Sequence, residues 1–82
     1  MATTAKELKE LMLQIGMDKA LVEGLDTTQP LAKQEVDSVD YPSFSLAVEE
    51  KYGVKISEAD SMRLKSINDF VAFVRLCLNY VL

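Results

Sequence analysis

The chain has 82 residues, of which 49% are hydrophobic and 27% charged, with a net charge of −4 and no histidine. That length suits one small domain, and that apolar content excludes a disordered chain. The missing histidine argues against catalysis by a serine nucleophile. No run approaches the roughly 18 apolar residues of a membrane span, and we expect no signal peptide.

The first predicted helix covers residues 4–15. Thr4 and Glu7 have the spacing of a capping box, in which the threonine accepts a backbone hydrogen bond and the glutamate reaches back to the cap. Gly16 stands where a left-handed residue commonly ends a helix. The apolar residues between them recur at helical spacing, at Leu8, Leu11, Met12 and Ile15.

A long connection follows this helix. Residues 18–23 predict one or two helical turns, and residues 25–34 predict a loop that Leu25 and Leu31 anchor in the core. Connections of this length are uncommon in a compact domain and often have a function. This one leads to Ser38.

The next predicted helix spans roughly residues 38–52. Pro42 conflicts with a helix that begins at Ser38, because proline has no N–H to donate and its ring would crowd the Ser38 carbonyl. We therefore expect either a distorted first turn over residues 38–41 or a regular helix that begins near Asp40.

Two further capping patterns open the remaining helices. The pattern at residues 57–60 predicts a short helix that ends near Arg63, with Met62 pointing inward, and the pattern at residues 66–69 opens the last helix. The apolar face of the last helix includes Cys77, which we expect to be a buried structural thiol. The apolar tail either packs on the first helix or meets a partner.

Together these elements predict one all-α domain over residues 1–82. The expected architecture is a small four-helix bundle, with three longer helices, one short helix and a long loop between helices one and two. The single cysteine cannot form an intramolecular disulfide, so we expect a cytoplasmic protein.

Negative charge is concentrated in residues 35–60. This window holds seven acidic residues and two lysines, a net −5, whereas the rest of the chain sums to +1. Such a surface would repel nucleic acid and suits a partner that offers Lys and Arg. A solvated acidic surface is the simpler interpretation.

Ser38 lies between Asp37 and Asp40, where the loop meets a helix. A serine there is either a helix cap or a hydroxyl presented to another molecule. No suitable base is near it in the sequence, so we expect no catalysis by Ser38 itself. The spacing of residues 37–48 does not fit a calcium loop, and we expect no metal site.

Three motifs resemble those of the acyl carrier proteins of fatty-acid and polyketide synthesis. They are Asp-Ser-Val-Asp at residues 37–40, Glu-Glu-Lys-Tyr-Gly at 49–53 and Ser-Ile-Asn-Asp-Phe-Val at 66–71, within a similarity that covers about residues 5–77. The resemblance implies that Ser38 receives 4′-phosphopantetheine from coenzyme A, through a separate Mg²⁺-dependent phosphopantetheinyl transferase. The arm would carry acyl groups as thioesters, and the protein would not be an enzyme.

The resemblance also implies partners and binding residues. Expected partners are acyl-transferring, condensing or acyl-activating enzymes with basic docking patches, and we expect a monomer. The residues implied in partner docking are Asp37, Val39, Asp40, Glu49 and Glu50. The candidates for an apolar acyl pocket are Phe44, Val48, Leu64 and Phe70, although residues of this kind in a sequence alone are more often plain core.

Some residues depart from the family pattern. Gln34-Glu35 stand where the family often has Leu-Gly, Ser43 replaces a typical acidic residue, and Pro42 and Ser45 are uncommon. These changes leave attachment at Ser38 intact and favour a specialised carrier. The absence of Gly-Gly before the serine favours acyl over peptidyl cargo.

A different class of function also fits the residues. A small acidic helical adaptor would have the same composition, and Ser38 would then be only a helix cap. Modification of Ser38 by a transferase distinguishes the two, because an adaptor would not accept the arm.

Overall fold

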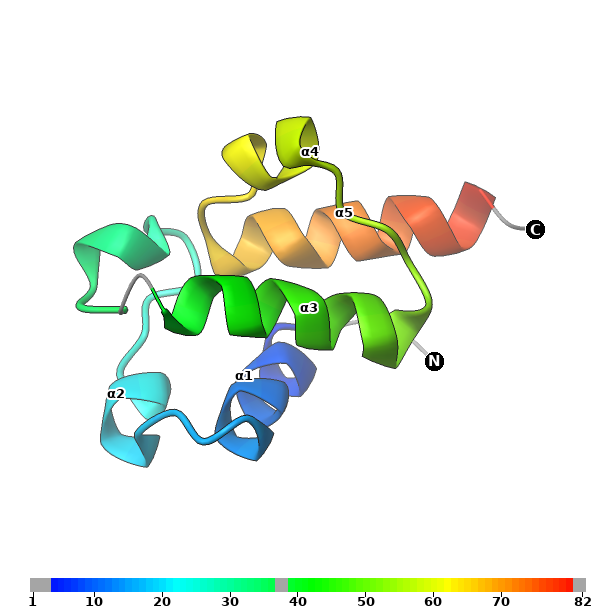
Figure 1. The fold of residues 1–82 in the computed structure, drawn as a ribbon. Helices are drawn as coiled ribbons and strands as arrows, with labels where there is room; N and C mark the ends of the chain where they lie inside the picture. The colour runs from blue at the N-terminus through cyan, green and yellow to red at the C-terminus, as the bar shows by residue number, and fades with distance from the viewer. Residues whose placement is uncertain (1–3, 37–38, 81–82) are drawn as a thin grey trace.

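The computed structural model describes residues 4–36 and 39–80 of the chain. These residues contain no strand. They form the helices α1 (Ala5–Gln14), α2 (Lys19–Glu23), α3 (Asp40–Tyr52), α4 (Glu58–Arg63) and α5 (Ile67–Tyr80), with a short 3-10 helix η1 (Leu31–Lys33) before α3 (Figure 1). The all-α prediction is confirmed. Helices α1, α3 and α5 are the three long ones, and α2 is the predicted short turn inside the long connection.

Helix α1 begins as its capping residues predict. The Oγ1 atom of Thr4 accepts a hydrogen bond from the Glu7 N–H at 3.2 Å. The Glu7 side chain instead accepts a hydrogen bond from the Tyr52 hydroxyl at 3.0 Å, so it joins α1 to the end of α3. The expected return bond of the capping box was therefore wrong. Gly16 follows the helix with φ +95°, a conformation that glycine adopts without steric cost.

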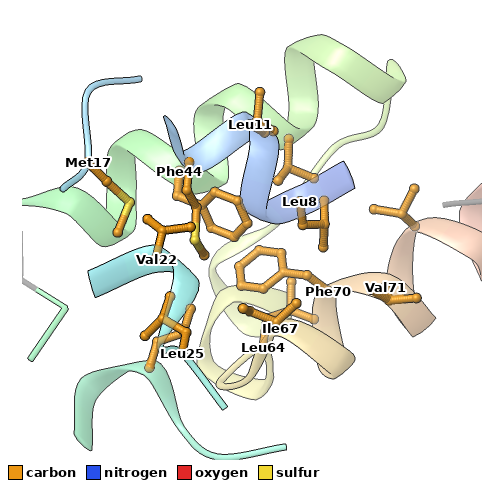
Figure 2. Close-up of a cluster of buried hydrophobic side chains, with 14 residues drawn as sticks. Leu8, Leu11, Met17, Val22, Leu25, Phe44, Leu64, Ile67, Phe70 and Val71 are labelled. Atoms are coloured by element: carbon orange, nitrogen blue, oxygen red, sulfur yellow. The ribbon is translucent and has the colours of Figure 1, made fainter. Parts of the chain in front are cut away.

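The core lies where α1, α3 and α5 face one another. Phe44 of α3 and Phe70 of α5 meet edge to face, with ring centroids 4.9 Å apart and both side chains at most 1% exposed (Figure 2). Burying a large apolar side chain stabilises a fold by about 1.5–3 kcal/mol. The buried apolar residues within the described chain are Leu8, Leu11, Met12, Met17, Val22, Leu25, Leu31, Phe44, Val48, Leu64, Ile67, Phe70, Val71 and Val74.

Gln34 holds the connection between α2 and α3 in a closed loop. Its Oε1 atom accepts from the Asp26 N–H at 2.7 Å, and its Nε2 atom donates to the carbonyls of Asp26 and Gln29 at 2.9 and 3.0 Å. The next residue, Glu35, has φ +66°, in the left-handed region that favours glycine. Of the two residues that depart from the family's Leu-Gly, Gln34 thus fixes the shape of this loop, and Glu35 adopts a backbone conformation that glycine would adopt without strain.

The same loop is attached to the beginning of α5. The Leu31 N–H donates to the Lys65 carbonyl at 2.7 Å, and the Asn68 N–H donates to the Thr27 carbonyl at 3.0 Å. Leu31 is buried, as predicted for an anchor of the loop. The connection is therefore held by side chains and backbone together.

Helix α3 begins at Asp40, after Val39 as the N-cap residue. Pro42 is consequently the third helical residue, where its missing N–H leaves no intrahelical bond unmade. This confirms the predicted start near Asp40. The alternative that involved Ser38 lies outside the described residues. Gly53 ends the helix with φ +66°.

Helix α4 has the predicted capping box but not the predicted inward face. Ser57 accepts from the Asp60 N–H at 3.1 Å, and the Asp60 carboxylate accepts from the Ser57 N–H at 3.4 Å. Met62, expected to point inward, is 76% exposed. Ser61 and Leu64 contact the start of α3 instead, and Met62 lies about 100° around the helix from Ser61.

Helix α5 begins with a second reciprocal box. The Asp69 carboxylate accepts from the N–H groups of Lys65 and Ser66, both at 3.0 Å, and the Ser66 hydroxyl accepts from the Asp69 N–H at 3.1 Å. Partial burial alone would raise the pKa of Asp69, but these hydrogen bonds keep it below the ordinary value. Cys77, expected to be buried, is only half-buried because it lies at the edge of the apolar face.

Candidate functional site

Ser38 and Asp37, the two central residues of the predicted site, lie outside the described residues. The structure describes their surroundings on both sides. Val36 is half-buried at the end of the connection, and Val39 is 70% exposed at the start of α3. The chain therefore reaches the surface directly after Ser38.

The predicted docking residues do not all share one exposed surface. Val39 and Glu50 are exposed, whereas Asp40 and Glu49 are half-buried. One carboxylate oxygen of Glu49 accepts a hydrogen bond from the Ile56 N–H at 2.6 Å, so this acid helps to hold the turn after α3. The docking role of these residues stays a prediction.

The exposed face of α3 is more apolar than the sequence suggested. Val39, Pro42, Leu46 and Glu50 are all exposed, and their spacing puts them on one side of the helix. Leu46 is 55% exposed. Within this row only Glu50 carries a charge.

The four acyl-pocket candidates are buried side chains of the core. Phe44, Val48, Leu64 and Phe70 are exposed by 5% or less. The structure brings them together between α3 and α5, with the rings of Phe44 and Phe70 in direct contact (Figure 2). Their role as the lining of an acyl pocket stays a prediction. Leu64 also reaches a groove on the surface.

Tyr41 is a residue that the sequence analysis missed. Its hydroxyl donates toward the carbonyls of Ser61, at 2.9 Å, and Leu64, and its ring centroid lies 5.9 Å from that of Phe70. The side chain therefore joins the first turn of α3 to the end of α4 and to the core. An aromatic residue with a polar tip so soon after the motif serine was the available signal.

The surface groove lies at the end of the bundle where α3 begins. Its volume is about 490 Å³, within the range of small-molecule sites. In Figure 1 the start of α3, the η1 segment and the α4–α5 turn gather at this end. The groove is lined by Pro30, Ala32, Lys33, Tyr41, Ser61, Leu64 and Lys65.

The electrostatics of this groove differ from those of the chain as a whole. Its charged lining residues are Lys33 and Lys65, both exposed, in a protein of net charge −4. Within residues 4–36 and 39–80, neither lysine is within ion-pair distance of a carboxylate. The groove can therefore offer two ammonium groups and an apolar floor to a ligand.

A second groove of about 260 Å³ lies on the other side of Tyr41. It also includes Ser61, but its charged lining residues are Glu49 and Glu58. Ser45 lines it too, and the Ser45 hydroxyl oxygen is buried with no hydrogen-bond partner among the described residues. This groove is acidic where the first is basic.

Two other kinds of site are absent from the part of the chain that the structure describes. No helix in residues 4–36 and 39–80 is both long and apolar enough to cross a membrane. The same residues contain no group of three or more His, Cys, Asp or Glu side chains placed to hold a metal ion.

Comparisons with known proteins agree with the motifs. A family model described as a phosphopantetheine attachment site matches residues 7–74. The acyl carrier protein of Solidesulfovibrio magneticus is 31% identical over 77 residues, covering 88% of this chain and 91% of that protein. The acyl carrier protein of Rhodococcus erythropolis is 29% identical over 62 residues, covering 76% of this chain and 58% of that protein. The predicted resemblance is confirmed: the chain belongs to the acyl carrier protein family, whose members are non-catalytic carriers with covalently attached 4′-phosphopantetheine.

Proposed function

We propose that this protein carries acyl groups as thioesters on a 4′-phosphopantetheine arm attached to Ser38. It would deliver them to enzymes of fatty-acid, polyketide or related specialised lipid synthesis. The observation that supports this most strongly is the phosphopantetheine-attachment match over residues 7–74, in which Ser38 is the serine of the Asp-Ser-Val-Asp motif. The exposed Val39 is consistent with a serine that another enzyme can reach.

A separate transferase would supply the chemistry of attachment. The Ser38 oxygen would form a phosphodiester bond to the phosphopantetheine half of coenzyme A. The adenosine bisphosphate half would leave, and the hydroxyl proton would pass to a base of the transferase. This division of labour suits a chain that has no histidine to act as that base. Any Mg²⁺ required would belong to the transferase site.

Docking of partner enzymes would use the exposed face of α3 and the acids near it. Exposed ion pairs contribute only about 0–1 kcal/mol each, and they speed encounter, which suits a carrier that must bind and leave repeatedly. We assign Asp37, Val39, Asp40 and Glu50 to this contact, with Glu49 as a contributor through its half-buried carboxylate. The carrier would act as a monomeric, cytoplasmic single domain.

The test is the mass of the protein after exposure to coenzyme A, Mg²⁺ and a broad-specificity phosphopantetheinyl transferase. Wild type and a Ser43→Ala control, with its change on the exposed surface of α3, should each gain one phosphopantetheine. Ser38→Ala should gain none. An unmodified wild type, or modification that persists in Ser38→Ala, would refute the assignment.

The adaptor alternative predicts a different pattern. Ser38 would then be only a helix cap, and Ser38→Ala would lower the free energy of unfolding by about 1 kcal/mol while no protein gained the arm. The described start of α3 does not favour this alternative, because the N-cap position there is Val39.

A further inference from the structure

The backbone of Glu35 has an unfavourable conformation close to the proposed attachment site. Its φ of +66° is the only positive φ among the described residues other than glycine. In this left-handed conformation the Cβ atom of a side chain lies too close to a backbone carbonyl oxygen, which disfavours the conformation by a factor of about 5–30. Such a conformation persists only where the surrounding structure holds it.

The residue before Glu35 is held firmly. The Gln34 side chain accepts from the Asp26 N–H at 2.7 Å and donates to the carbonyls of Asp26 and Gln29 at 2.9 and 3.0 Å. The Gln34 N–H also donates to the Leu31 carbonyl at 3.0 Å, and Leu31 is buried. Gln34 is therefore fixed through both its side chain and its backbone.

The residue after Glu35 is also fixed, because Val36 is half-buried and packs against the core. The chain must join Gln34 to Val36 through Glu35, and the left-handed angle is the one that joins them in this structure. The three side-chain hydrogen bonds of Gln34 thus help to hold Glu35 in a conformation that it would otherwise leave.

The direction of the chain at Glu35 bears on Ser38. An extended chain advances at most about 3.3–3.6 Å per residue, so Ser38 lies within about 7 Å of Val36 along the chain. On the other side, α3 begins at Asp40. A change in the path at Glu35 would therefore move the segment that contains the Ser38 hydroxyl.

We propose that Gln34 is a positioning residue for attachment of the arm, because its hydrogen bonds hold Glu35 in the conformation that presents Ser38 to the phosphopantetheinyl transferase. This inference rests on the proposed carrier function. Gln34 takes no part in the bond changes, in which the Ser38 oxygen binds phosphorus and adenosine bisphosphate leaves. It acts by raising the fraction of the carrier that the transferase can bind.

Gln34→Ala removes the three side-chain hydrogen bonds. The left-handed conformation then becomes the minor one, and the KM of the transferase for the carrier rises as the competent fraction falls. We expect kcat/KM to fall about fivefold or more, with kcat unchanged. The assay is run at a temperature at which circular dichroism shows every variant to be folded, so that lower stability alone changes neither constant.

A second substitution separates positioning by Gln34 from direct contact with the transferase. Glycine adopts positive φ about as readily as negative φ. The double variant Gln34→Ala/Glu35→Gly should therefore return to within about twofold of the wild-type kcat/KM. Gln34→Ala/Glu35→Ala removes the same charge but keeps a Cβ atom, so it should show no recovery.

Gln29→Ala is the matched control in the same loop. It makes the same change as Gln34→Ala and keeps the carbonyl that accepts from Gln34, while the Gln29 side chain makes no hydrogen bond within residues 4–36 and 39–80. We expect wild-type kinetics. By NMR, a strong NOE between the amide and α hydrogens of residue 35 marks positive φ, and Gln34→Ala should weaken it.

The possible failures are distinct. If the wild type gains no arm by mass, the carrier function and this inference both fail. If the wild type is modified and Gln34→Ala has the same kcat/KM, the inference alone fails. A fall in kcat at constant KM, a fall that Glu35→Gly does not reverse, or an equal fall in Gln29→Ala would each show that Gln34 does not act through Glu35.

Discussion

The two grooves beside Tyr41 differ in charge although they share a wall. Both include Tyr41 and Ser61, and the Tyr41 hydroxyl donates a hydrogen bond to the Ser61 carbonyl. The groove next to the long connection has Lys33 and Lys65, and the groove next to α4 has Glu49 and Glu58. One aromatic side chain therefore divides an acidic surface suited to basic partners from a small basic site.

Substitution of Tyr41, which lines both grooves, should have the largest effect on the free energy of unfolding. Tyr41→Ala should lower the free energy of unfolding by about 2–4 kcal/mol, since it deletes a half-buried ring that packs on Phe70. Tyr41→Phe keeps the ring and removes the donor from two carbonyls, so we expect a loss of about 1–2 kcal/mol. Chemical denaturation measures both.

Amide NMR shifts then show whether Tyr41 separates the grooves. Tyr41→Phe should shift the amides of Ser61, Leu64 and Lys65. Tyr52→Phe, at the other end of α3, should leave them unchanged. If Tyr41→Phe changes the NMR shift of no amide in either groove, the Tyr41 hydroxyl does not hold the two grooves apart.

The loop that carries Lys33 offers a second test. Glu35 has φ +66°, which costs a residue with a side chain about 1–2 kcal/mol. Glu35→Gly should therefore raise the free energy of unfolding by about 0.5–1 kcal/mol, after allowance for the greater freedom of glycine in the unfolded chain. Glu35→Ala keeps the strain and should show no such gain. Equal effects of the two substitutions would mean that charge, and not backbone strain, governs this position.

Substitution of Ser45 in the acidic groove should have the smallest effect on the free energy of unfolding. The Ser45 hydroxyl is buried without a partner among the described residues, so Ser45→Ala should leave the free energy of unfolding unchanged or raise it by up to about 1 kcal/mol. Ser43→Ala, on the same helix, removes a hydrogen bond to the Val39 carbonyl at 3.2 Å and should be slightly destabilising. Clear destabilisation by Ser45→Ala would show that its hydroxyl has a partner after all.

Local signals predicted most of the fold correctly. The caps at Thr4, Ser57 and Ser66 and the glycines after α1 and α3 act within a few residues, so their chemistry is readable in the sequence. Pro42 gave the start of α3 by the same kind of local argument. The fold class followed from these boundaries and the apolar spacing between them.

The predictions were wrong or incomplete where a side chain's position depends on contacts with residues far away in the sequence. Helix α4 has only six residues, too few for apolar spacing to show which side faces the bundle, and Met62 was placed on the wrong side. Glu7 has a tertiary partner in Tyr52 that its capping motif does not reveal. Tyr41 was missed because its acceptors lie 20 and 23 positions away in the sequence.

Two backbone hydrogen bonds join the connection between α2 and α3 to residues 65 and 68, and they affect the order in which the protein folds. Leu31 and Thr27 can make them only after the start of α5 has docked, because their partners belong to the last third of the chain. The groove that contains Lys33 and Lys65 therefore forms late in folding. A nascent chain that still lacks its final helix would already contain Ser38, but it would not yet have formed the groove that contains Lys33 and Lys65.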